Sequence, residues 1–272
     1  MLSRATDLGL LAARNGHARD ARVRFDEGPH VYYVDGTAIG ASVTGLLKEV
    51  EGDPFDAEAV SLRKSRWPDE RYNAGVDRAG KWIPMTPKAI RAQWDLARDL
   101  GTDLHARIEK HLNGEVVCVK DTHAHQNLEE FLQAMRWIAA CGLEPYRTEW
   151  VIFDEDADVA GSIDFVARDP ATGALVIIDW KRCRNGDDVY RFSSRRDGVM
   201  LKPPLDHLPD TTLSHWAAQV NLYRIILERH YAVVISRMQM VCVYAGQGEA
   251  RVYEHARDDK VAALLDRRMA KK

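Results

Sequence analysis

Two aspartates and a lysine interrupt two otherwise apolar stretches in the middle of the chain. Asp164 lies in the run Ala-Gly-Ser-Ile-Asp-Phe, and Asp179 and Lys181 lie in the run Ile-Ile-Asp-Trp-Lys. Charged side chains are costly in an apolar strand unless they bind a partner or a metal ion. Carboxylate oxygens are the ligands that Mg²⁺ and Mn²⁺ prefer. This pattern therefore predicts a divalent metal site.

Two antiparallel strands must position these side chains. The turn-forming run Asp-Pro-Ala-Thr-Gly separates the two stretches, as in a β-hairpin. We expect the register to pair Asp164 with Asp179 and Ser162 with Lys181 on one face. Two carboxylates about 5 Å apart repel each other by roughly 3 kcal/mol at an effective dielectric constant of about 20, and a divalent cation removes that repulsion. The alternative is a surface hairpin with solvated charges.

The same residues, with one glutamate upstream, resemble the core signature of the PD-(D/E)XK nuclease superfamily. The matching elements are Glu149, the Gly-Ser-Ile-Asp run that ends at Asp164, and the Ile-Asp-Trp-Lys run that ends at Lys181, which is the D-x-K form of the signature. The resemblance implies an α/β fold with a restriction-endonuclease-like core, in which helices flank a central mixed β-sheet. It covers about residues 90–245.

Two outer elements are similar to those of the RecB-like exonuclease branch. They are a Gly-Thr-x-x-His run that ends at His105 and a Gln-x-x-x-Tyr element formed by Gln219 and Tyr223. Helical periodicity over residues 90–112 places His105 and Glu109 one turn apart on one face. A solvated surface pair and a core-edge tyrosine are the structural alternatives for these two elements.

The resemblance also implies a role for each matching position. The implied catalytic residues are Asp164, Asp179, Lys181 and Glu149. The implied ligands of Mg²⁺ or Mn²⁺ are His105, Asp164, Asp179 and the backbone carbonyl of Trp180. Substrate binding is expected from Gln219, Tyr223, Arg182 and Ser162, and Glu109 is expected to support the metal ligands.

The function implied by the resemblance is metal-dependent hydrolysis of DNA phosphodiester bonds. We expect an exonuclease that acts on single-stranded or end-bearing DNA in repair, recombination or replication; RNA stays open as a substrate. The alternatives are a structure-selective endonuclease, an inactive nucleic-acid-binding protein with the same fold, and a hydrolase of small phosphate esters. The chain has no phosphate-loop motif, so a helicase or another replication or recombination partner must be a separate protein.

The overall charge neither requires nor excludes a nucleic-acid substrate. The 272 residues carry a net charge of −3, with 29% charged and 46% hydrophobic residues, as in ordinary globular proteins. Metal ions can compensate an acidic active site, and binding to DNA needs only a local basic surface. The candidate surface, for which a solvated loop is the alternative, consists of Lys181, Arg182, Arg184, Arg191, Arg195 and Arg196.

The chain is expected to divide into an N-terminal extension, residues 1–90, and the nuclease core, residues 91–272. The extension contains a predicted hairpin and a segment rich in charge, Pro and Trp, residues 52–87. The resemblance to the RecB-like exonucleases implies a lid or arch for this segment, and an ordinary surface excursion is the alternative. The four cysteines are far apart in the sequence. The resemblance implies an iron-sulfur cluster only where a closely spaced group of cysteines follows the core, so no cluster is expected. No apolar run is long enough for a membrane helix. We expect an intracellular, soluble protein of the cytoplasm or the nucleoid or nucleus, with an organellar transit peptide as the minor alternative.

Overall fold

The computed structural model describes residues 9–52, 55–66, 70–117, 126–183 and 198–270. The chain forms two compact units. The first consists of Met1–Gly52 with Leu104–Lys272, and the second consists of Asp53–Asp103. The long helix α4 (Pro87–Leu112) belongs to both units, because the boundary falls within it.

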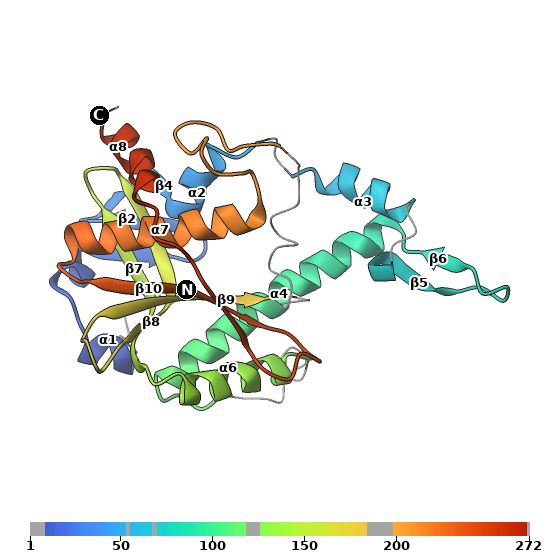
Figure 1. Cartoon of the computed structure of the whole chain (residues 1–272), viewed down its shortest axis with the longest axis horizontal. Helices are drawn as coiled ribbons and strands as arrows, with labels where there is room; N and C mark the ends of the chain where they lie inside the picture. Colours follow the sequence, from blue (N-terminus) through green and yellow to red (C-terminus); the bar gives the residue numbers. More distant parts are fainter. Residues whose placement is uncertain (1–8, 53–54, 67–69, 118–125, 184–197, 271–272) are drawn as a thin grey trace. The chain divides into compact units, whose positions relative to one another are not determined.

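A six-stranded mixed sheet forms the centre of the first unit (Figure 1). Strands β7, β8 and β9 are antiparallel neighbours, β10 is parallel to β9, and β11 is antiparallel to β10. The short strand β4 is parallel to the start of β8. In chain order the strands are β4 (Ala41–Ser42), β7 (Glu144–Asp154), β8 (Val159–Arg168), β9 (Leu175–Arg182), β10 (Ile235–Val243) and β11 (Arg251–Glu254).

Strand β8 changes its partner along one edge. Its second half pairs with β9 as far as Phe165 opposite Ile178, whereas its first residues, up to Ala160, pair with β4. Among the described residues, neither ladder includes residues 161–164. The sheet therefore has a gap along this edge of β8, between the end of β4 and the point where β9 diverges.

This gap corrects the register expected from the sequence. The hairpin and its antiparallel pairing are confirmed, but the ladder ends one pair before Asp164 and Asp179. The predicted pairing of Ser162 with Lys181 is wrong, because β9 has left β8 at that point. Ser162 instead lies opposite Val151 of β7, on the other edge of β8.

Helices cover both faces of the sheet (Figure 1). Neighbouring residues of β9 point to opposite faces: Ile177 packs in a cluster with α2, α7 and α8, and Ile178 packs in a cluster with α6 and the last part of α4. Both faces of the sheet are thus buried under apolar side chains, as expected for a sheet that contains parallel strands. The bounds of these helices are α2 (Val43–Lys48), α6 (Leu128–Ala140), α7 (Thr212–His230) and α8 (Ala263–Met269).

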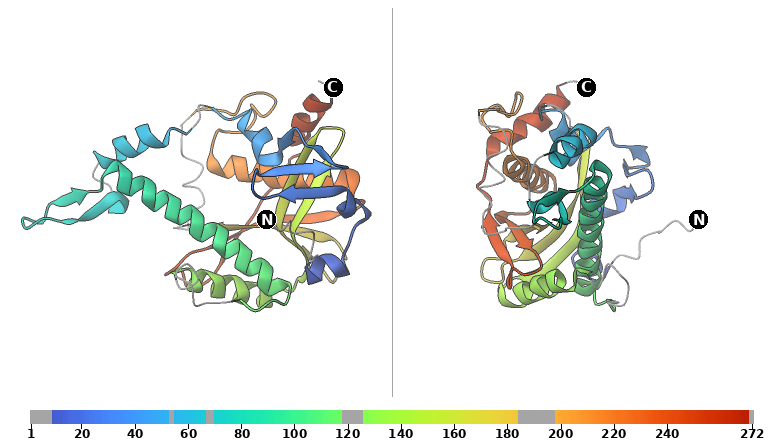
Figure 2. Two further views of the ribbon diagram at one scale, coloured as in Figure 1. Left: turned by 180° about the vertical axis from the view of Figure 1, so that it is seen from behind. Right: turned by 90° about the vertical axis from the view of Figure 1, so that its right-hand side faces the viewer.

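A separate three-stranded antiparallel sheet packs against β7 and β8 (Figure 2). The positive φ angles of Asp35 and Gly36, 49° and 82°, make the tight turn that the sequence predicted. Tyr32 is buried against Phe153 and Ala160. The elements of this N-terminal part are α1 (Leu10–Arg14), the 3-10 turn η1 (Ala18–Arg22), β1 (Val23–Asp26), β2 (Val31–Val34) and β3 (Thr37–Ala38).

The second unit contains elements that the sequence did not predict. In it, the ring of Trp94 on α4 packs against Phe55 and Tyr72, with ring centroids 5.7 and 6.2 Å apart. The apolar side chains here are too few and too irregular to give a periodic signal. Its elements before α4 are α3 (Ala57–Ser65), the 3-10 turn η2 (Glu70–Tyr72), and the hairpin strands β5 (Asn73–Val76) and β6 (Trp82–Pro84).

The predicted fold class is confirmed: helices flank a central mixed sheet, as in a restriction-endonuclease-like core. The helix predicted over residues 90–112 is α4, and Gln219 and Tyr223 both lie on α7. The last part of the chain adds the 3-10 turn η4 (Asp259–Ala262) before α8. Within the described residues, every helix is too short or too polar to span a membrane.

Candidate metal centre

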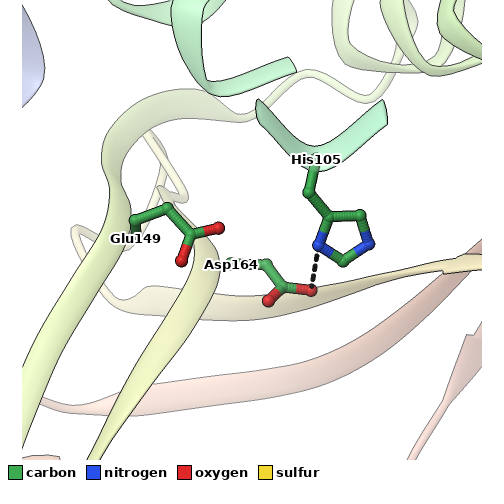
Figure 3. Close-up of side chains that lie close together, drawn as sticks. All are labelled: His105, Glu149 and Asp164. Carbon is green, nitrogen blue, oxygen red and sulfur yellow. Dashed lines mark ion pairs between the residues drawn. The ribbon is translucent and has the colours of Figure 1, made fainter. Parts of the chain in front are cut away.

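Three side chains from three different elements meet beside the gap in the sheet (Figure 3). They are His105 of α4, Glu149 of β7 and Asp164 of β8, and their ligand atoms all lie within 4.8 Å of one another. His105 Nδ1 lies 3.5 Å from Asp164 Oδ2. One imidazole and two carboxylates at this spacing could hold one divalent cation.

Helix α4 carries His105 to this position from its C-terminal half. The helix starts at Pro87, a residue type favoured in the first turn, and Thr86 Oγ1 accepts a hydrogen bond from the amide of Ala89. Leu104 and Ile108, which flank His105, are completely buried against the sheet. Because their packing fixes the rotation of the helix, His105 faces the gap.

Asp164 and His105 also hold the end of β9. Asp164 Oδ2 accepts a hydrogen bond from the amide of Trp180 at 3.0 Å, and His105 Nε2 lies 3.1 Å from the carbonyl oxygen of Trp180. The side chain of Asp164 thus accepts the backbone hydrogen bond that a continued β8–β9 ladder would otherwise provide, at the point where β9 diverges from β8. The Trp180 carbonyl, a predicted ligand, lies directly beside the cluster.

Glu149 reaches the cluster through an irregularity in β7. Its φ angle is 41°, a left-handed conformation that is rare for a non-glycine residue. Its neighbours Thr148 and Trp150 remain paired with β8, so the distortion is confined to this residue. Ser162 Oγ donates a hydrogen bond of 2.9 Å to Glu149 Oε2. Such local strain persists where the surrounding structure determines it, and it is frequent at functional sites.

Burial, followed by the nearby charge of Asp164, raises the pKa of Glu149 to about 8. The charges of Glu109 and Asp179 act in the same direction. In the metal-free protein the carboxyl group therefore holds a proton that a divalent cation would displace. Glu109, predicted to support the ligands, is close enough to influence Glu149 electrostatically.

Asp179 and Lys181 lie on the diverging end of β9, outside the three-residue cluster. Lys181 Nζ is 2.6 Å from Asp179 Oδ2, and it lies 5.5 Å from the centroid of the Trp216 ring. Burial lowers the pKa of Lys181, but Asp179 and Asp164 outweigh this effect and raise it above its ordinary value. Lys181 is therefore a cation at neutral pH, and it can act on a negatively charged group only electrostatically.

The donor set fits a divalent ion. Two carboxylates of the cluster and the buried carboxylate of Asp179 influence one another's protonation, which is unfavourable without a counter-charge. Asp179 Oδ2 is buried and makes no hydrogen bond of normal geometry with any described residue, although Lys181 is near. Hard oxygen donors and a single imidazole suit Mg²⁺ or Mn²⁺ better than a thiolate-preferring metal.

Tyr223 is buried in the core beside Gly161. Only 4% of its surface is exposed, and its hydroxyl accepts a hydrogen bond of 3.0 Å from Gln219 Nε2. The charge of Asp164 contributes to raising its pKa, after burial, which is the main cause. The Gln-x-x-x-Tyr element is thus a hydrogen-bonded pair on α7, and substrate binding by these two residues stays a prediction.

Gly161 is required by this packing. A Cβ atom at position 161 would lie 2.8 Å from Tyr223 Cε1 and 3.1 Å from Val43 Cγ2, closer than packed atoms tolerate. We expect Gly161→Ala to lower the free energy of unfolding by about 1–3 kcal/mol. Urea denaturation followed by circular dichroism measures this effect.

Gly101 on α4 provides the matched control for Gly161. An added Cβ there meets no atom within 4 Å, and alanine is the better helix former by about 1 kcal/mol. Gly101→Ala is therefore expected to leave stability unchanged or to increase it. Equal destabilisation by both substitutions would contradict the role given to the contact between Gly161 and Tyr223.

Arg182, which was predicted to bind substrate, forms an ion pair with the buried carboxylate of Glu130. Its guanidinium lies 2.9 Å from Glu130 Oε1, and it packs 5.0 Å from the centroid of the Tyr244 ring. Glu130 is completely buried, so this ion pair connects β9 to α6. Contact between Arg182 and substrate stays a prediction. The remaining arginines of the proposed basic surface, residues 184–196, lie outside the described residues.

Two aromatic residues of the site were not identified from the sequence. Tyr32 on β2 is buried beside Glu149, whose charge, after burial, raises the pKa of this tyrosine to about 12. Trp216 on α7 lies against the ammonium of Lys181. The sequence predicted the strand that carries Tyr32, but no local pattern relates residues so far apart in the chain.

The raised pKa of Glu149 predicts a pH-dependent stability in the absence of metal. The pKa rises from 4.5 in the unfolded chain to about 8 in the folded protein, so the folded state binds more protons between these values. Stability from this group is complete below pH 4.5 and is lost as the pH rises through 8. We expect the Tm of the metal-free protein to fall by roughly 5 °C from pH 5 to pH 8 because of this group.

Glu149→Gln isolates this contribution. The variant cannot ionise at position 149, so its Tm should depend less on pH than that of the wild type over the same range. Differential scanning calorimetry in the presence of a chelator measures both curves. Parallel curves for the two proteins would contradict the assignment.

Comparison with known proteins supplies only distant structural similarity. No protein family model and no curated protein sequence matches the chain. A crystal structure named "Putative exonuclease" from Eubacterium rectale is 13% identical, with a TM-score of 0.38; the match covers 84% of this chain and 77% of that one. The structure of SSO0001 is also 13% identical, with a TM-score of 0.29, over 68% of this chain and 85% of that one. Both TM-scores are low, so the function is inferred below from the residues of the site.

Proposed function

We propose that this protein is a metal-dependent nuclease that hydrolyses phosphodiester bonds of DNA. The observation that carries the proposal is the cluster of His105, Glu149 and Asp164 beside the paired Asp179 and Lys181 at the gap in the sheet. Such a site combines ligands for a hard divalent ion with a fixed cation. These are the two components that hydrolysis of a charged phosphate ester requires.

Each side chain has a separate task in this proposal. His105, Glu149 and Asp164 would hold the ion, and Asp179 and the Trp180 carbonyl are the further predicted ligands. Bound Mg²⁺ or Mn²⁺ would supply a nucleophile from water at neutral pH and would neutralise charge on the phosphate. Lys181 remains protonated and stabilises the negative charge that grows on the phosphate oxygens in the transition state. Ser162 orients Glu149 through its hydrogen bond.

Within this class we propose an exonuclease that acts on single-stranded or end-bearing DNA. The support is the resemblance of His105 and of the Gln219 and Tyr223 pair to the RecB-like branch. A structure-selective endonuclease would use the same cluster. A binding protein without activity is disfavoured, because the chain retains an acidic cluster and a lysine that binding alone does not need.

Substrate topology tests the proposal. The protein is incubated with Mg²⁺ or Mn²⁺ and with end-labelled single-stranded, double-stranded and circular DNA, in parallel with Asp179→Asn. Degradation of linear DNA beside intact circles is expected from an exonuclease, and linearised circles would indicate the endonuclease instead. Failure to cleave any of these substrates with either ion would contradict nuclease function. Asp206→Asn, at an exposed aspartate outside the site, controls for the loss of one charge.

A further inference from the structure

A second cluster of potential metal ligands lies where the turn between β7 and β8 meets the end of α7. Asp154 is the last residue of β7, Asp156 lies in the turn, and His230 is the last residue of α7. One ligand atom from each residue lies within 4.8 Å of the other two. None of these residues belongs to the candidate metal centre described above.

Asp154 has a buried oxygen atom that the fold leaves without a hydrogen bond. Its side chain is 1% exposed, and Oδ1 accepts a hydrogen bond of 2.8 Å from the amide of Ala157, which shapes the turn. Oδ2 lies 3.0 Å from His230 Nε2, but the angles do not allow a normal hydrogen bond, and both atoms are buried without another partner among the described residues. A buried carboxylate oxygen in this state is costly unless something else binds it.

We propose that Asp154, Asp156 and His230 form a binding site for a divalent metal ion and that the site prefers Zn²⁺. The geometry supports this assignment. Ligand atoms of a tetrahedral zinc site lie about 3.3 Å apart when each is about 2.0 Å from the metal, close to the 3.0 Å between Asp154 Oδ2 and His230 Nε2. Asp156 is exposed, so its side chain can adjust to complete the site.

The mixed ligand set determines which metals fit. The second site offers one imidazole nitrogen and two carboxylate oxygens, which suit zinc with water in the fourth position. The nuclease centre has the same three kinds of ligand, but the carboxylate of Asp179 and the carbonyl oxygen of Trp180 are further predicted oxygen ligands there. Mg²⁺ prefers six oxygen ligands and retains several waters, which the nearly inaccessible Asp154 disfavours. The second site should therefore discriminate against Mg²⁺.

The ion would tie the β7–β8 turn to α7. A hydrogen bond of 3.1 Å from the amide of Phe153 to the hydroxyl of Tyr231 already connects the same two elements. A ligand that binds the folded state alone stabilises it by mass action. At a hundredfold excess over its Kd, zinc is expected to raise the Tm by about 5 °C.

Metal analysis and calorimetry on the full-length protein test this site without a measurement of nuclease activity. Chelator-treated protein is titrated with Zn²⁺ alone, and bound metal is counted after dialysis. Asp156→Asn is the informative variant, because residue 156 is exposed and its replacement should not impair folding. We expect this variant to bind one zinc equivalent fewer than the wild type and to lose the associated rise in Tm.

Two control variants keep the second site distinct from the nuclease centre. Asp164→Asn changes only the nuclease centre, and Asp206→Asn removes an exposed charge elsewhere; both should retain the zinc equivalent lost in Asp156→Asn. Co²⁺ in place of zinc should give visible absorption that also depends on Asp156. Wild-type protein that binds no zinc, or an Asp156→Asn variant with wild-type stoichiometry, would overturn the proposal and leave Asp154 and His230 as an ion pair.

Discussion

Lys181→Ala is expected to lower kcat for phosphodiester cleavage by at least about 10³-fold, the upper range for the loss of one electrostatic group in an active site. The reason is the position of the ammonium, which lies 2.6 Å from Asp179 and keeps its proton because Asp179 and Asp164 raise its pKa. Arg182, the next cation along β9, is paired with Glu130. Single-turnover cleavage of labelled DNA with Mg²⁺ measures the effect.

Folding must be measured together with activity, because the substitution leaves Asp179 buried without its cation. Such a loss costs about 3–5 kcal/mol in other proteins, so circular dichroism and DNA binding should be recorded at a temperature well below the Tm. Both are expected to persist. Lys202→Ala, at an exposed lysine, is the matched control and should cleave normally. Undiminished cleavage by a folded Lys181→Ala protein would exclude Lys181 from the reaction.

Asp164→Asn is expected to abolish binding of Mn²⁺ at the nuclease centre and to reduce cleavage by at least about 10³-fold. The amide oxygen can still accept the hydrogen bond from Trp180, so the local structure should survive while the charge is lost. Isothermal titration with Mn²⁺ and the cleavage assay measure the two effects separately.

The same substitution should stabilise the metal-free protein above pH 8, where Glu149 is ionised. Asp164 raises the pKa of Glu149 because the two negative charges repel each other, and asparagine removes that repulsion. A rise in Tm of about 2–4 °C corresponds to roughly 1 kcal/mol for a protein of this size. Asp206→Asn should change neither Tm nor cleavage. If Asp164→Asn retained Mn²⁺ binding and activity, the metal centre would have to lie elsewhere.

Much of the secondary structure could be predicted from local patterns. The turn-forming run after β8 predicted the hairpin, and the periodic positions of Ile90, Leu104 and Ile108 predicted the helix that became α4. These signals extend over few residues, and the same residues are buried in the folded protein. The α3 helix and the β5–β6 hairpin were not predicted, because their apolar residues follow no clear period.

The detailed geometry of the site depended on contacts between distant segments. Glu149 was predicted as a catalytic residue, but nothing in the sequence predicted the positive φ angle with which its backbone presents the carboxylate to Asp164. Arg182 was predicted for substrate, yet it pairs with Glu130, 52 residues away. Neither outcome has a local sequence signal, because each depends on which element packs beside the strand.

The sequence by itself determined the donor atoms of the site and the strands that carry them, since side-chain alternation and turn residues act over a few positions. Only the tertiary structure decided where the strands separate. β4 replaces β9 beside β8, and His105 packs against the Trp180 carbonyl from 75 residues away. Where the strands separate depends on how helices bury both faces of the sheet. This packing involves the whole first unit, so no short stretch of sequence can predict it.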